Sequence, residues 1–134
     1  MANALYDLGR ESFLKGEISW SADNIKVVLV DSADYVVNLS TDQFLSNVPA
    51  GARAVNGTSA NLTAKTTTAG AADAADVTFT AVTGDVSEAL VIYQDSGVEG
   101  TSRLIAYIDA ATGLPVTPNG GDIQVQWSAP IFTL

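Results

Sequence analysis

The sequence predicts a mainly β domain, a β-sandwich or jelly-roll-like fold with an N-terminal α-helix and one short helix. About six to eight short strands, separated by turns rich in glycine or proline, indicate this class. Residues 76–82 alternate between apolar and polar side chains, whereas the two strands within residues 89–109 are apolar on both faces. A strand that is apolar on both faces must be covered twice, so the fold needs a second layer.

Composition limits the function before any motif is considered. The 134 residues predict a single domain spanning 1–134. The chain has no cysteine and no histidine, which excludes disulfides and removes the usual general base. The net charge is −9, from 15 acidic and 6 basic residues, and the basic residues are spread along the chain. We therefore expect no nucleic-acid partner.

Residues 3–15 are predicted to form the N-terminal helix. Asn3 is a suitable N-cap and Gly16 a suitable residue for the left-handed turn that ends a helix. Leu14 is the one apolar residue on the polar side. The apolar side consists of Leu5, Tyr6, Leu8, Gly9 and Phe13. We expect this helix to cover part of one sheet face and the second sheet to cover the other, leaving some apolar surface for a neighbouring subunit.

A short helix or turn is predicted at residues 41–46. Ser40 and Gln43 have the spacing of a capping box, and Pro49 ends the segment.

The remaining elements are strands and turns. The predicted strands are residues 24–31, 52–55, 76–82, the two within 89–109, 122–127 and an edge strand that begins at Pro130. Ala81 is expected to point inward, and Pro118, Asn119 and Gly120 to form a hairpin turn with Gly120 at positive φ. The predicted core consists of Val27, Leu29, Phe79, Leu90, Ile92, Ile105, Val125 and Trp127.

Residues 56–75 form a low-complexity loop or arm, in which Leu62 is the only large apolar residue. Small side chains bury too little area to offset the entropy of ordering. The segment is therefore a long hairpin, a loose loop, or an arm that becomes ordered on a partner.

No group of residues in the sequence forms a catalytic motif. The aspartate pairs Asp31/Asp34 and Asp73/Asp76 lack a surrounding motif, so we interpret them as solvated loop acids. Trp20 and Trp127 are suited to stacking on a sugar, but such residues more often belong to a core or an interface. We predict no enzyme, with no catalytic, cofactor-binding or metal-ligating residue.

Three stretches of the chain resemble small structural proteins encoded by tailed bacteriophages. They are MANALYDLGRESFLKGEISW, ALVIYQDSG and, above all, LIAYIDAATGLPVTPNGGDIQVQW. The resemblance lies in whole phrases that cover most of the chain, with residues 56–75 the least characteristic part, so it transfers no functional residue. A small, acidic, cysteine-free protein of this kind looks most like a capsid decoration (cement) protein.

The resemblance implies a location and a set of partners. We expect a protein made in the cytoplasm of the bacterial host and placed on the capsid exterior of the virion, where it bridges major capsid subunits. It is expected to form a homo-oligomer, with a trimer as the favoured state, and to bind neither membrane nor nucleic acid. The helix and residues 56–75 are the segments expected to make the contacts. The alternative is a tail component: a tube subunit, a fibre module, or a baseplate module that binds a receptor or glycan.

Overall fold

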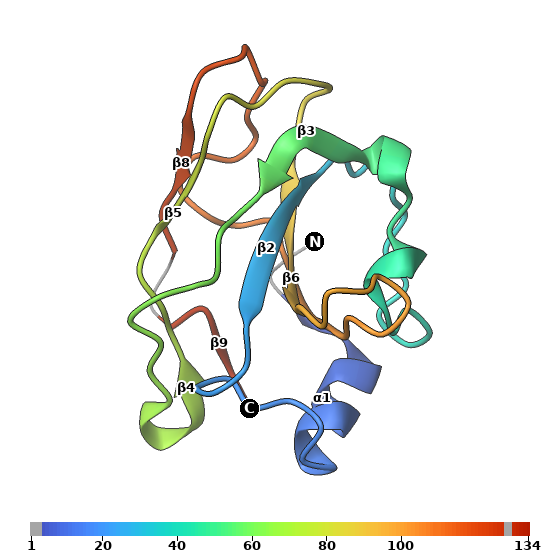
Figure 1. Cartoon of the computed structure of the whole chain (residues 1–134), viewed down its shortest axis with the longest axis vertical. Coiled ribbons are helices and arrows are strands. Elements are labelled where there is room, and N and C mark those ends of the chain that lie inside the picture. Colours follow the sequence, from blue (N-terminus) through green and yellow to red (C-terminus); the bar gives the residue numbers. More distant parts are fainter. Residues whose placement is uncertain (1–3, 128–129) are drawn as a thin grey trace.

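The computed structural model describes residues 4–127 and 130–134, and it is a mainly antiparallel β structure with one α-helix near the N-terminus (Figure 1). This confirms the predicted fold class. Its centre is a five-stranded sheet in the order β1-β7-β6-β2-β3. These strands are β1 (Ala4–Leu5), β2 (Ile25–Val30), β3 (Arg53–Thr58), β6 (Ala89–Gln94) and β7 (Leu104–Ile108).

Two short antiparallel ladders cover one face of this sheet (Figure 1). One joins β4 (Ala71–Ala72) to β9 (Phe132–Thr133), and the other joins β5 (Val77–Phe79) to β8 (Ile123–Val125). The tail therefore adds a strand, as predicted. The covering layer thus consists of two separate ladders and not of one continuous second sheet.

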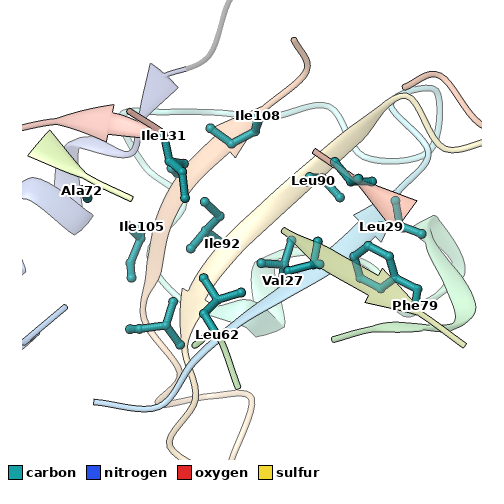
Figure 2. Close-up of a cluster of buried hydrophobic side chains, with 14 of the residues drawn as sticks. Val27, Leu29, Leu62, Ala72, Phe79, Leu90, Ile92, Ile105, Ile108 and Ile131 are labelled. Carbon is teal, nitrogen blue, oxygen red and sulfur yellow. The ribbon is translucent and has the colours of Figure 1, made fainter. Parts of the chain in front are cut away.

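The first core lies between the central sheet and the ladders (Figure 2). Its side chains from β2, β6 and β7 meet Phe79 of β5 and Ile131, which precedes β9. Seven of the predicted core residues are buried there: Val27, Leu29, Phe79, Leu90, Ile92, Ile105 and Val125. Trp127 is half-buried and packs against the edge of this core.

A second core covers the opposite face of the same strands. The connection formed by residues 31–52 lies over Val28, Val91 and Tyr107 of the sheet. Tyr6 also belongs to this core. The connection contributes Tyr35, Leu45, Val48 and Ala52, all of them buried. The expectation that the helix covers this face was wrong. Both faces of the central strands are covered by their own chain, so these strands offer no apolar face to a neighbouring subunit.

Helix α1 (Asp7–Leu14) is shorter than predicted. Ala4 and Leu5 pair with β7 as a strand, while Tyr6 takes the N-cap position; Asn3, the predicted N-cap, lies outside the described residues. The helix ends as expected, because Gly16 has φ +75°. Phe13 of α1 packs against the first core, its ring centroid 6.2 Å from that of Phe132.

Gly9 sets the distance between α1 and the sheet. A Cβ atom at this position would lie 2.5 Å from the carbonyl oxygen of Leu104. The helix can therefore approach the β7 backbone only because this residue has no side chain.

The short helix or turn predicted at 41–46 is present as a 3-10 turn, η1 (Leu45–Asn47), and a second 3-10 turn, η2 (Ala50–Ala52), follows it. The predicted capping box is not formed. The hydroxyl of Ser40 donates to Asn38 Oδ1 at 2.8 Å and caps no helix. The 3-10 turns let the connection direct Leu45 and Val48 toward the same core over a short length of chain.

The strand predicted at 76–82 is interrupted at Ala81. This residue has φ +53° and is exposed, and Val82 is buried in its place, so the inward orientation of Ala81 was wrong. Gly120 has φ +86° as predicted. However, the amide of Gly120 donates to Val82 O, and Val116 pairs with Ser87, so residues 118–120 do not close a local hairpin.

Residues 56–75 are bonded into the domain, which favours the hairpin among the three alternatives. β3 continues to Thr58, and the amides of Ser59 and Leu62 then donate to Val27 O and Ile25 O, both at 2.8 Å. The segment next folds back through the 3-10 turn η3 (Thr68–Gly70), with Thr66 paired to Asp73. Leu62 is 6% exposed and belongs to the first core. The expectation of an arm ordered chiefly by another chain is thus wrong.

Candidate functional site

An acidic cluster lies where β2 leaves the sheet. Carboxylate oxygens of Asp31, Asp34 and Asp85 lie within 4.8 Å of one another, and they are the group among the described residues that can hold a metal ion. Asp31 is only 8% exposed, so its interpretation as a solvated acid was wrong, whereas Asp34 is exposed as expected. Asp31 Oδ1 accepts the amide of Ala33 at 2.9 Å, a bond that fixes the turn after β2.

Asp73 and Asp76 have structural contacts of their own. Asp73 Oδ1 accepts the amide of Ala74, and Asp76 Oδ1 accepts the amide of Trp127 at 3.2 Å. These bonds hold the chain between β4 and β5 and tie it to the segment after β8. Both residues were predicted to be solvated loop acids, and both accept hydrogen bonds that organise the loop.

The two tryptophans belong to the packed part of the molecule. Trp20 is 5% exposed, its Nε1 donates to Asp73 O at 3.3 Å, and its ring meets Phe132 edge to face. The indole of Trp127 donates to Ala75 O at 3.1 Å and is half-buried. A buried ring cannot stack on a sugar, so the glycan interpretation is excluded for Trp20.

A buried polar chain runs through the second core, and the sequence analysis missed it. The hydroxyls of Tyr6 and Tyr35 are 2.8 Å apart, and that of Tyr35 donates to Asp42 Oδ2 at 2.7 Å. Burial raises the pKa of both tyrosines above its usual range. Three residues far apart in sequence carry no spacing signal, so only the fold brings them together. The chain of bonds ties the connection to β1 and the start of α1.

Every basic side chain has a partner. Four of these pairs are Lys15–Glu11, Lys26–Asp95, Arg53–Glu99 and Arg103–Glu17, at 2.8 to 3.3 Å, and Arg10 pairs with Asp7. Lys65 donates to Asp23 O at 2.6 Å. The pairs are distributed over the molecule, and no cluster of cations of the kind that binds a phosphate backbone results.

An apolar groove runs between α1 and the C-terminal strand. Its larger part, about 420 Å³, is lined by Leu5, Arg10, Phe13, Leu14, Thr133 and Leu134. A smaller apolar hollow of about 80 Å³ continues it, because Phe13 and Leu134 line both. Leu14 is 90% exposed and Leu134 59% exposed. In Figure 1, α1 and the C-terminus lie at the same end of the molecule. We call this groove, together with the charged residues of α1 and the neighbouring Lys15, Glu17 and Arg103, the α1 corner. The sequence did carry one signal for it, since Leu14 broke the polar side of the helix.

No helix among the described residues has both the length and the apolar character needed to cross a membrane. No protein-family model matches the chain, and no curated protein matches its sequence.

Proposed function

We propose that this protein is a non-enzymatic structural component of a tailed-bacteriophage virion, where it decorates the capsid exterior and stabilises the shell by bridging major capsid subunits. The observation that carries the proposal is the resemblance of residues 104–127 to small phage structural proteins. This stretch includes β7 of the central sheet and β8 of the covering layer. The similar residues are thus those that specify the fold, as expected for a protein whose function is to assemble.

Two properties of the surface support a structural function. The chain carries a net charge of −9, which suits a surface facing outward and not one lining packaged DNA. The α1 corner exposes Leu14 and Leu134 beside an apolar groove, and such a patch is typical of a contact between subunits. Each bound copy adds contacts that free capsid subunits lack, so binding favours the assembled shell by mass action.

Two features that the sequence suggested as contact surfaces do not support the proposal. The central strands no longer support it, because their second face is covered by residues 31–52. Residues 56–75 no longer serve as a docking arm, because they bond to β2. Within the tail alternative, the tube subunit loses support for the same reason, since it would need that segment as a pairing loop.

Copy number in purified virions is the decisive measurement. Quantitative mass spectrometry against the major capsid protein should find hundreds of copies per particle, and labelling should place them on the capsid. A handful of copies located on the tail contradicts the proposal. Particles that lack this protein should lose DNA at lower temperature than complete ones, and equal tolerance of heat would also overturn the cement function.

A further inference from the structure

We propose that the α1 corner is the surface through which two copies of this chain associate, with the two α1 helices meeting antiparallel. This concerns the homo-oligomer expected from the resemblance, with a two-fold contact in place of the expected trimer, and it rests on the proposed function only for the existence of a homo-oligomer. Purified protein alone tests it, so its failure is distinguishable from a failure of capsid binding.

The charge distribution identifies a second copy as the occupant. Two copies that each carry a net charge of −9 repel one another unless they meet at surfaces where acidic and basic side chains are equal in number. The α1 corner is balanced: its acids Asp7, Glu11 and Glu17 are matched by its bases Arg10, Lys15 and Arg103, in three ion pairs. Removing these from the 15 acids and 6 bases of the chain leaves 12 acids and 3 bases. The rest of the molecule therefore carries the whole net charge of −9.

The shape of the corner is complementary to itself. Leu14 projects from the rim of the groove, while the groove beside it has apolar walls formed by Leu5, Phe13 and Leu134. In a two-fold arrangement, the Leu14 side chain of each copy can enter the groove of the other. The antiparallel arrangement also brings the Asp7 end of one helix beside the Lys15 end of its partner, which favours opposite charges across the contact.

Another large exposed apolar side chain, Val36, does not offer the same combination. Val36, which is 84% exposed, borders a hollow lined by Glu88 and Asp109 with no basic residue. Two copies meeting there would bring acidic side chains together. Val36 is thus a matched control, because its exposure is close to the 90% of Leu14 while its surroundings are acidic.

Sedimentation and light scattering across a concentration series test the inference. The wild type should show a mass at least twice the 13.8 kDa of the chain. Leu14→Glu should raise the dissociation constant at least tenfold, and Leu134→Glu should do the same from the opposite wall. Val36→Glu should associate like the wild type. Circular dichroism should show the same fold for all three variants, since each replaced side chain is mostly exposed.

Three results overturn the inference: a wild type that is monomeric at all concentrations, a Leu14→Glu variant that associates like the wild type, or a Val36→Glu variant that dissociates equally. Charge reversal gives an independent test. Lys15→Glu alone should weaken association, because it sets an acid against the Asp7 end of the partner helix, whereas Asp7→Lys with Lys15→Glu again places opposite charges across the contact and should restore it. A double variant that associates no better than Lys15→Glu contradicts the antiparallel charge pairing.

Discussion

The hydroxyl of Tyr6 donates its proton to that of Tyr35 across 2.8 Å within the second core. The direction follows from the next bond, because Tyr35 donates its own proton to Asp42. Removing the Tyr35 hydroxyl therefore leaves the buried Tyr6 hydroxyl and Asp42 without this partner. Removing the Tyr6 hydroxyl leaves the Tyr35 bond to Asp42 intact.

We expect Tyr35→Phe to lower the free energy of unfolding by about 1 to 3 kcal/mol and Tyr6→Phe by about 0.5 to 1.5 kcal/mol. Urea unfolding monitored by circular dichroism measures both. A larger loss for Tyr6→Phe than for Tyr35→Phe contradicts the assigned direction of the bond.

The stability of the protein should fall in alkaline solution. All four tyrosines have a raised pKa with burial as the largest cause, and that of Tyr93 reaches about 12. A raised folded-state pKa means that the unfolded chain loses its protons first. The stabilisation is thus complete below pH ~10 and is lost as the pH rises toward 12 and beyond.

Absorbance of tyrosinate near 295 nm, recorded with circular dichroism through the same pH range, tests this expectation. The tyrosines should ionise above their usual pKa, together with loss of structure. A tyrosine that ionises near pH 10 in a fully folded protein would refute the expectation for that residue.

Gly9→Ala should destabilise the protein even though alanine is favoured over glycine within a helix by about 1 kcal/mol. The added Cβ would lie 2.5 Å from Leu104 O, so α1 must move away from β7. We expect a net loss of about 1 to 3 kcal/mol in thermal or urea unfolding. Gly100→Ala is the control, because nothing lies within 4 Å of a Cβ there and its effect should be near zero. Equal effects of the two substitutions would show that the helix is not in tight contact.

Phe79→Ala should cost about 3 to 5 kcal/mol, because this side chain is 1% exposed at the centre of the first core. Trp127→Ala should cost less, since Trp127 is half-buried at the edge of that core. Chemical denaturation of both variants under one set of conditions gives the comparison. If Phe79→Ala unfolds at the same denaturant concentration as the wild type, the packing of β5 against the central sheet is contradicted.

The amides of Ser59 and Leu62 should be protected from hydrogen exchange about as well as those of β2. Each donates to a carbonyl of β2 at 2.8 Å. Deletion of residues 56–75 should consequently abolish folding instead of merely removing a loop. Exchange of these two amides at the rate of an unstructured peptide would restore the earlier interpretation of a loose arm.

The sequence predicted the central strands well because their apolar residues form long, uninterrupted runs. It also predicted the left-handed glycines at positions 16 and 120. It did not reveal what covers the second face, since residues 31–52 show neither strand nor helix periodicity and bury their apolar groups through 3-10 turns. Residues 56–75 were misjudged because their stability comes from backbone bonds to β2, which leave no apolar pattern in the sequence.

The candidate site was predictable only in part. Leu14 was recognisable as an apolar residue on the polar side of the helix, but its neighbour Leu134 comes from the other end of the chain. The two meet only because β9 pairs with β4, and no local pattern encodes that pairing.

The pairing of distant segments has a consequence for how the protein reaches its fold. Ala4 pairs with Tyr107, Ala72 with Phe132 and Phe79 with Ile123, so most of the structure depends on contacts between residues far apart along the chain. Closing such large loops costs entropy before any contact compensates for it, which places the domain among slow folders, in the range of milliseconds to seconds. β6 and β7 are the exception, since they adjoin through the single turn between Gln94 and Leu104. This pair is apolar on both faces and is the natural folding nucleus. Until residues 31–52 and the two ladders cover it, a newly made chain exposes its most aggregation-prone surface.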